Sequence, residues 1–317
     1  VREPEAGEVL VGVKACGFCG HDKILAGYAG EEWQPFGHEF AGVVEKVGHG
    51  VKNVKVGDRV VVETSIFDPV SDYARNGRPE LDTKGPNYMT MEHTGMGFAE
   101  KTIVPAILCV PFTDLEDREA CFLEPMGVAA DLILTADIHL GQDVLLMGCG
   151  AIGLMALQMA KASGARNIYV AEHKANQKKI ELAKQFGATD VILTDEMALT
   201  DYPFPRGGVD RVLVTTPPVT IAEAVKVANV GGIVAFLGIS YGPGAMVTFD
   251  SNLVHLNKLQ IRGSNAIPAL YFPHCLDLVK AGIVDVKPLI THTFPLEKAP
   301  EGIMEFLTDY AHAVKAV

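Results

Sequence analysis

The chain has 317 residues, which is more than one hydrophobic core usually serves, so two domains are expected. Hydrophobic residues make up 48% and charged residues 21%, as in packed soluble proteins, and the net charge of -12 argues against a nucleic acid partner. The sequence contains neither an apolar run long enough to span a membrane nor a signal peptide, so we expect a cytoplasmic protein.

The first third of the chain predicts a β domain. Short runs of β-branched residues alternate with Gly and Asp, and little of this part has helical periodicity. Strands are expected over 8–15, 39–48, 58–63 and 101–110. The opening residues read as the middle of a domain, so we expect that a short N-terminal piece is missing.

From about residue 120 the pattern changes to alternating strands and helices, which indicates a parallel sheet covered on both faces. The expected strands cover 143–147, 167–172, 190–194, 210–216 and 233–239, and the expected helices cover 122–138, 151–165, 176–188, 220–232 and 272–283. The predicted fold is therefore α/β, with a doubly wound Rossmann sheet over 123–265 and a mainly β catalytic domain over 1–122 and 266–317.

"GCGAIG" places Gly148, Gly150 and Gly153 in G-x-G-x-x-G spacing between an apolar strand and a helix, the context of a pyrophosphate-binding turn. Glu172 closes the next strand, where a carboxylate accepts hydrogen bonds from ribose hydroxyls and repels a 2′-phosphate. NAD is thus favoured over NADP, although Lys174 and Lys178 weaken that preference. The alternative is a nucleotide-free domain whose glycines only pack helix on strand. The predicted cofactor contacts are Gly148, Gly150, Ala151, Ile152, Gly153, Glu172, Thr215 and Gly238.

Candidate metal ligands lie in "CGFCGHD" and "FGHEFAG". Cys19, His38 and Glu39 offer sulfur, imidazole and carboxylate, and Glu124 offers a second carboxylate where the chain enters the nucleotide domain. Such a set suits a tetrahedral zinc with an open position. In the alternative interpretation, His38 is a hydrogen-bonded strand histidine and Glu39 faces solvent.

Several motifs, in order along nearly the whole chain, resemble the medium-chain zinc alcohol and polyol dehydrogenases: "GFCGHDKILAG", "GHEFAGVVEKVGHGVKNVKVGDRVVVE", "GFAEKTIVP", "LEPMGVA", "KLQIRGS" and "FPLEKAPEGI". The resemblance implies a GroES-like catalytic domain. It also implies that Cys19, His38 and Glu39 are catalytic zinc ligands of the sorbitol-dehydrogenase-like branch. Glu124 would bind zinc directly or through water, or exchange with the neighbouring acid.

Two positions depart from the family pattern. The family usually has Ser or Thr, which relays the substrate proton, where this chain has His21. We therefore interpret His21 as the proton acceptor, or else as a structural histidine that bonds cofactor or backbone, and Asp22 as a loop anchor or a partner of a ligand. Where relatives have four cysteines, this chain has Asp68, Ser71, Ala74 and Asp82, so no structural zinc is expected.

Six cysteines, mostly in apolar stretches, indicate free thiols in a reducing compartment. Cys16 matches no ligand and is expected to pack in the core, since a CxxC redox pair would need a thioredoxin-like setting. Trp33, Phe40 and the stretch 88–96 are candidate walls of the substrate pocket.

The predicted function is a zinc-dependent oxidoreductase that transfers hydride between a secondary alcohol (a polyol, sugar or cyclitol) and NAD, with one zinc per chain. The alternatives are a metal-free alkene or quinone reductase and a non-enzymatic NAD-binding protein. By resemblance, a homodimer or homotetramer is expected, paired through an edge strand of the nucleotide domain at "IVAFLGIS".

Overall fold

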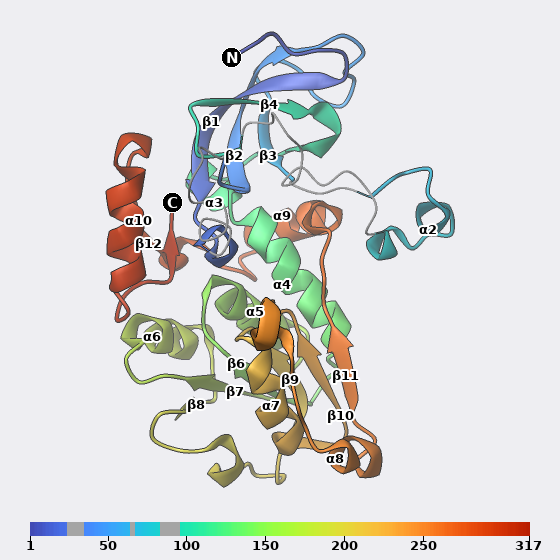
Figure 1. Ribbon diagram of the computed structural model, residues 1–317, viewed down its shortest axis with the longest axis vertical. Helices are drawn as coiled ribbons and strands as arrows, with labels where there is room; N and C mark the ends of the chain where they lie inside the picture. The colour runs from blue at the N-terminus through green and yellow to red at the C-terminus, as the bar shows by residue number, and fades with distance from the viewer. Residues whose placement is uncertain (24–34, 64–66, 83–95) are drawn as a thin grey trace.

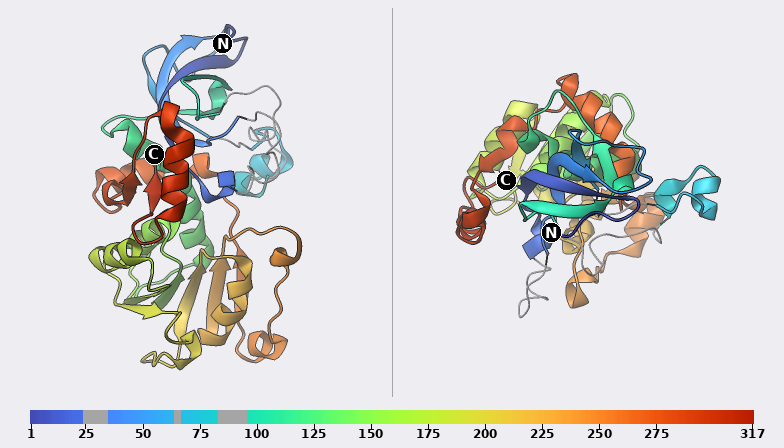
Figure 2. Two further views of the ribbon diagram at one scale, coloured as in Figure 1. Left: turned by 60° about the vertical axis from the view of Figure 1, so that its left-hand side comes forward. Right: turned by 90° about the horizontal axis from the view of Figure 1, so that it is seen from above.

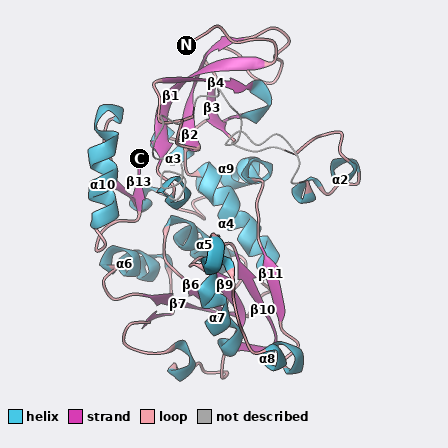
Figure 3. Ribbon diagram, in the orientation of Figure 1, coloured by secondary structure: helices cyan, strands magenta, loops and turns pink. Residues whose placement is uncertain are grey.

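The computed structural model describes residues 1–23, 35–63, 67–82 and 96–317. Figure 1 shows two lobes: one contains an antiparallel sheet near the N-terminus, and the other contains a parallel sheet. Figure 3 shows helices packed around the parallel sheet, whereas strands dominate the first lobe. No helix in the described part of the chain is long and apolar enough to cross a bilayer.

The first lobe holds a five-stranded antiparallel sheet in the order β4-β1-β2-β3-β5. Its strands are β1 (Glu8–Gly17), β2 (Glu39–Val47), β3 (Arg59–Val62), β4 (Lys101–Pro105) and β5 (Cys109–Pro111). The strand expected over 101–110 is divided, because the chain turns through a short 3-10 helix after Pro105, a residue that cannot donate to a ladder. One face of this sheet is packed with valines, as its β-branched runs predict.

The second lobe holds a six-stranded sheet in the order β11-β10-β9-β6-β7-β8, and its neighbouring strands are parallel. Its strands are β6 (Asp143–Met147), β7 (Asn167–Glu172), β8 (Asp190–Leu193), β9 (Val209–Val214), β10 (Ala228–Phe236) and β11 (Gln260–Gly263). The helices α5 (Ala151–Ala162), α6 (Gln177–Phe186), α7 (Ile221–Val227) and α8 (Ser251–Leu256) connect them. The predicted α/β architecture, a doubly wound parallel sheet beside a mainly β domain, is confirmed.

Two predictions about this sheet were wrong. The helix expected over 220–232 ends at Val227, and the next residues begin β10 instead, with an irregularity around the Gly231–Gly232 pair. The segment "IVAFLGIS" is not an edge strand, because β10 lies between β9 and β11. The free edge on this side is β11, a strand whose short, partly polar sequence has only a weak pattern.

Helix α4 (Leu123–Ala136) joins the two lobes. It contacts β2 and β3 on one side and β9, β10 and α5 on the other, and it runs between the sheets in Figure 1. The largest core cluster accordingly includes residues of both lobes, for example Ala41 and Val61 together with Leu132 and Leu154. Burying one helix against two sheets fixes Glu124, in its first turn, at the boundary between them.

The chain returns to the first lobe at its end. Helix α9 (Phe272–Lys280), strand β12 (Ile290–His292), helix α10 (Ala299–Thr308) and strand β13 (Lys315–Ala316) form this section. Figure 2 shows α10 on the outside of the molecule, with the C-terminus next to it. The backbone of Phe18 donates to the carbonyl of Ala316 at 3.0 Å, so the last strand lies directly against the segment that carries Cys19.

Candidate metal and dinucleotide site

The antiparallel pairing of β1 and β2 brings Cys19 and His38 together. Gly17 at the end of β1 pairs with Glu39 at the start of β2, so the residues just beyond this pair approach one another. One ligand atom from each of Cys19, His38 and Glu39 lies within 4.8 Å of the other two. Three of the four predicted ligands therefore converge, although they come from segments about twenty residues apart.

Asp22 orients this cluster through both of its carboxylate oxygens. Oδ2 accepts a hydrogen bond from the backbone N–H of Cys19 at 3.0 Å, and Oδ1 lies 3.0 Å from Nδ1 of His38. Nδ1 of His38 is thus occupied, and Nε2 is the ring nitrogen left for the cluster. A carboxylate in this position fixes the tautomer and the ring orientation of a metal-ligating histidine.

The cluster lies in an excess of buried acid. Glu39, Glu63 and Glu124 are all buried, and in the described part of the chain the nearest buried ammonium is Lys315, which forms an ion pair with Glu39. Burial, together with the nearby charges of Glu39 and Glu63, raises the pKa of Glu124 to about 8 against the opposing charge of His38. A divalent cation bound here would favour the ionised form of Glu124.

The donor set also fits zinc chemically. Sulfur, imidazole nitrogen and carboxylate oxygen are the three zinc ligand types, and two of the three residues are buried. Glu124 is not part of the 4.8 Å cluster, but its charge acts on His38. The prediction that Glu39 could face solvent was wrong, because Glu39 is only 1% exposed.

The candidate ligands Cys19 and His38 both have raised pKa values. Burial lowers the pKa of His38, but the hydrogen bonds with Asp22 and Cys19 and the charge of Glu124 outweigh it and raise this pKa to about 12. Burial, followed by the charge of Glu39, raises the pKa of Cys19 above its usual value. A metal ion must therefore displace protons from this site.

His21 lies where the two lobes meet. Its Nε2 is 3.1 Å from the hydroxyl of Tyr241, which belongs to the loop after β10, and the ring centroids are 6.3 Å apart. Burial, followed by the charge of His38, lowers the pKa of His21, with Asp22 acting in the opposite direction. Its backbone N–H donates to the sulfur of Cys19 at 3.4 Å, so His21 sits beside the metal cluster and opposite the Rossmann sheet.

The glycine turn has the geometry that a pyrophosphate requires. Gly148 has a φ of +96°, and Gly153 packs so closely on the carbonyl of Gly148 that a side chain there would collide with it. Gly150, the first residue before α5, has open space where its Cβ would be. The turn is therefore closely packed at Gly153 and open at Gly150. The open side lies at a helix N-terminus, whose N–H groups attract anions.

Two further predicted cofactor contacts support this turn from the neighbouring strands. The hydroxyl of Thr215 donates to the carbonyls of Met147 and Gly148 at 2.9 and 3.0 Å. Gly238 packs against the carbonyl of Thr216, with no room for a side chain. Ala151 and Ile152 form the first turn of α5.

The carboxylate of Glu172 lies beside the turn. Its Oε2 accepts a hydrogen bond from the backbone N–H of Cys149 at 2.8 Å, and its Oε1 accepts from the N–H of His173 and the amide of Asn176. The two lysines nearby are engaged elsewhere: Lys174 with Glu196 at 2.5 Å and Lys178 with Glu181 at 2.8 Å. The carboxylate is thus the dominant charge next to the expected ribose.

The segment that carries four cysteines in relatives is held here by hydrogen bonds. The side chain of Asp82 accepts from the N–H of Asp68 at 2.9 Å. Ser71 accepts from the N–H of Ala74 at 3.2 Å and so caps α2 (Asp72–Arg75). These bonds join the first and last of the four positions without sulfur.

Other predictions fall outside the site. Phe40 is fully buried in the core of the antiparallel sheet, so its assignment to the substrate pocket was wrong. Trp33 and residues 88–95 lie outside the described residues. Cys16 is partly buried against the core of the first lobe, and all six cysteines are free thiols.

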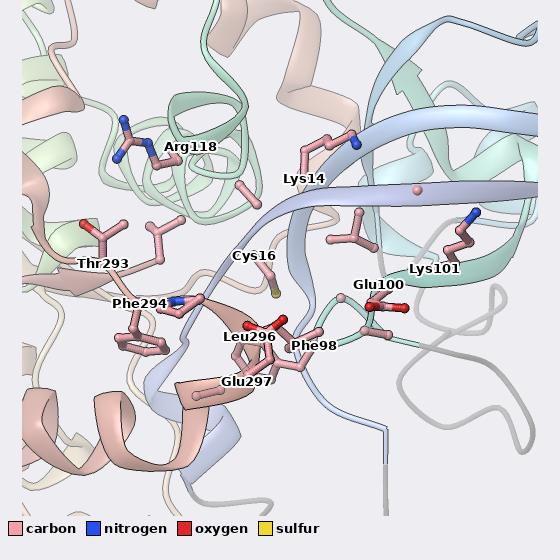
Figure 4. Close-up of a pocket in the computed structure, with 18 of the residues that line it drawn as sticks. Lys14, Cys16, Phe98, Glu100, Lys101, Arg118, Thr293, Phe294, Leu296 and Glu297 are labelled. Atoms are coloured by element: carbon pink, nitrogen blue, oxygen red, sulfur yellow. The ribbon is translucent and has the colours of Figure 1, made fainter.

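A groove of about 640 Å³ on the first lobe is separate from this site (Figure 4). It lies between Lys14 and Cys16 of β1 and the segment Phe294–Glu297, and none of the predicted ligands or cofactor contacts lines it. Lys101 in its wall is paired with Glu45 at 2.6 Å.

Sequence reasoning missed Lys315, Glu63 and Tyr241. Lys315 stands among Val314, Ala316 and Val317, and Glu63 directly follows the three valines of β3. A charge next to such apolar residues is the signal that could have indicated burial. Tyr241 gives no such signal, because only the fold brings it to His21.

Comparison with known proteins agrees with this geometry. Residues 5–114 match the alcohol dehydrogenase GroES-like domain family, and residues 151–281 match the zinc-binding dehydrogenase family. The L-threonine 3-dehydrogenase of Bacillus velezensis is 32% identical over 311 residues, covering 93% of this chain and 87% of the relative. This chain belongs to the medium-chain zinc-dependent alcohol dehydrogenase family.

Solved structures of the family superpose on the whole chain. The alcohol dehydrogenase RspB of Escherichia coli CFT073, complexed with NADH, has a TM-score of 0.87 at 29% identity, and the match covers 100% of this chain and 93% of RspB. A zinc-binding dehydrogenase of Sinorhizobium meliloti 1021, bound to NADP, has a TM-score of 0.86 at 26% identity, with the same coverage. The chain is accordingly a zinc-dependent, NAD(P)-linked oxidoreductase of the alcohol dehydrogenase type.

Proposed function

We propose that this dehydrogenase oxidises a secondary alcohol with NAD, using one zinc ion held by Cys19, His38 and Glu39. The observation that carries the proposal is the convergence of these three side chains within 4.8 Å in a buried, acid-rich site. A metal-free reductase of similar fold would have no need of this convergence, and a non-enzymatic NAD-binding protein would need only the glycine turn.

When bound, zinc supplies Lewis acidity toward the substrate oxygen. The residues of this chain hold and orient the site. Asp22 fixes the His38 ring, and Lys315 forms a buried ion pair with Oε2 of Glu39. Glu124 is the fourth candidate, placed to act through a water molecule or to exchange with Glu39, since it lies outside the close cluster but within electrostatic reach.

His21 is the proposed acceptor of the alcohol proton, directly or through water. Its ring lies beside the metal cluster and faces the Rossmann lobe, and its lowered pKa keeps the imidazole neutral near pH 7, as a proton acceptor requires. Substituting His21 with Ala should change the pH–rate profile. An unchanged profile and rate would remove His21 from the mechanism.

NAD is the proposed cofactor in preference to NADP. The buried Glu172 carboxylate would repel a 2′-phosphate, and the nearby ammonium groups of Lys174 and Lys178 are already paired with carboxylates. Gly148, Gly150, Ala151, Ile152 and Gly153 would hold the pyrophosphate.

The proposed substrate is a polyol, sugar or cyclitol, all of which offer a secondary hydroxyl. The relative from Bacillus velezensis is named for L-threonine, which also carries a secondary hydroxyl, so hydroxy amino acids belong in the same test. We further propose one zinc per chain, a cytoplasmic homodimer or homotetramer, and a nucleotide domain bounded at 123 and 265.

The test is a turnover screen of polyols, sugars, cyclitols, hydroxy amino acids and simple primary alcohols, each with NAD and with NADP. We expect turnover of a secondary alcohol with NAD that disappears on chelation and returns with zinc. Turnover that survives complete zinc removal, or a preference for activated alkenes, would contradict the proposal. The variant Cys19→Ser is the matched control, because it removes one ligand and leaves the dinucleotide turn intact.

A further inference from the structure

The side chain of Asn176 is committed to Glu172 rather than to its own helix. Asn176 is the residue at the start of α6, and Asn is among the best residues at this position because its side-chain oxygen can accept from the first N–H groups. Here no such cap forms. The amide nitrogen instead donates to Oε1 of Glu172 at 2.8 Å.

This bond completes the fixation of the Glu172 carboxylate. A carboxylate has about four acceptor positions. The described contacts fill three of them: Asn176 and the N–H of His173 on Oε1, and the N–H of Cys149 on Oε2. One acceptor position then remains on Oε2, the oxygen tied to the glycine turn.

The three groups that donate hydrogen bonds to Glu172 are of two kinds, backbone and side chain. The N–H groups of Cys149 and His173 belong to the backbone of the turn and of the strand end, so they are present whatever the side chains are. Asn176 is the only side chain of the three, and it holds the carboxylate from the side of α6. Without it, Glu172 could rotate about its side-chain torsions and move its charge away from the ribose position.

We propose that Asn176 is a positioning residue that sets the preference for a dinucleotide with a free 2′-hydroxyl. It fixes the carboxylate so that Oε2 meets the ribose hydroxyl, and so that the negative charge stays where a 2′-phosphate would have to lie. The inference rests on the proposed use of NAD and adds a residue, outside the glycine turn and the strand-end acid, on which that preference depends.

The experiment is equilibrium titration of NADH and NADPH into the purified, zinc-loaded full chain, followed by nicotinamide fluorescence. For Asn176→Ala we expect the Kd of NADH to rise about 3- to 10-fold, with the Kd of NADPH unchanged or lower. The preference for NADH, measured as the Kd of NADPH divided by the Kd of NADH, should therefore fall. In a Glu172→Ala background the same substitution should have no further effect, because Asn176 acts through Glu172. Gln177→Ala, at the adjacent exposed position, should leave both constants unchanged.

Asn176→Asp separates loss of the hydrogen bond from loss of the side chain. Asp has the size of Asn but cannot donate to Glu172, and its carboxylate would repel that of Glu172, so NADH should bind more weakly although a side chain of the same size is kept. The inference would be overturned if both variants bound NADH with unchanged affinity. It would also be overturned if Asn176→Ala lost equal affinity for the two dinucleotides, or if it caused the same loss of NADH affinity in the Glu172→Ala background as alone. If the unsubstituted chain binds neither dinucleotide, the proposed function fails first.

Discussion

Asp22 orients the proposed metal site although it offers no ligand atom to it. Its two oxygens bind the backbone of one ligand residue and the ring of another, so a single carboxylate sets the geometry of both Cys19 and His38. Substitution with Asn keeps the shape, but it removes the charge and places an amide N–H₂ opposite one of the two N–H donors. We expect Asp22→Asn to weaken zinc binding about 10- to 100-fold in a chelator competition assay.

The control for this substitution is Asp72→Asn, which changes an exposed aspartate at the start of α2. It should leave the zinc affinity unchanged. Equal zinc affinity in Asp22→Asn and the unsubstituted chain would show that Asp22 has only a structural role in the loop.

The raised pKa values of Cys19 and His38 predict a pH dependence of metal binding. Both groups keep their protons near neutral pH in the metal-free chain, since the pKa of His38 is raised to about 12 and that of Cys19 lies above its usual value. Zinc must displace these protons, so its affinity should rise steadily as the pH increases from 6 to 8. Chelator competition at several pH values measures this slope, and a flat profile would contradict the assignment of these two ligands.

The limits of prediction from sequence are also visible at single residues. The convergence of Cys19 and His38 was predictable from the resemblance of their motifs to those of the family, since Cys and His are too common for their spacing alone to indicate it, and the antiparallel pairing of β1 and β2 brings the two residues together. Lys315 was not, because its contact with Glu39 joins residues at opposite ends of the chain and depends on how β13 docks. The register of loops and tails depends on tertiary packing, which local patterns do not encode.

The glycine turn between β6 and α5 is the element on which we propose that dinucleotide binding depends. Gly153 and Gly150 differ in what surrounds them, since a side chain at the first would strike the carbonyl of Gly148 and a side chain at the second would enter open space. We expect Gly150→Ala to keep its melting temperature and to lose about tenfold or more in NADH affinity, because the methyl group occupies the place of the pyrophosphate.

Gly153→Ala should instead lower both the melting temperature and the NADH affinity, because the collision is with backbone. Thermal unfolding and NADH titration of the two variants give the comparison. If Gly150→Ala binds NADH normally, the pyrophosphate does not lie against this turn.

At the scale of elements, periodicity predicted the Rossmann strands well and the helix ends less well. The short strand β6, which is apolar after its first residue Asp143, and the helix α5 that follows it are unambiguous patterns. The end of α7 was not predictable, because "ANVGG" has residues compatible with a helix end and only the pairing of Ala228 with β9 draws them into β10.

For the whole molecule, the contact between His21 and Tyr241 is a polar link between the lobes beside the metal cluster. Removing the tyrosine hydroxyl should loosen this contact without affecting the ligands. For Tyr241→Phe we expect an unchanged zinc content and a change in kcat or KM of about tenfold or less, as the loss of one hydrogen bond implies. A loss of zinc in this variant would show that the loop after β10 supports the metal site itself.

The arrangement of the two lobes was predictable in kind, because a change from strand runs to strand–helix alternation marks the boundary. The position of α4 between the two sheets could not be predicted from the sequence. Its apolar residues are distributed around the helix because it packs between two sheets, and periodicity cannot distinguish that from burial in a single core.

We propose a single zinc that is held by one sulfur together with nitrogen and oxygen. The most direct measurement is zinc K-edge X-ray absorption on the purified chain after its metal content has been quantified. We predict one zinc per chain, with one sulfur neighbour at about 2.3 Å and the remaining neighbours at about 2.0–2.2 Å. A spectrum with no sulfur neighbour or with several, or a metal content of two zinc ions per chain, would contradict this ligand set.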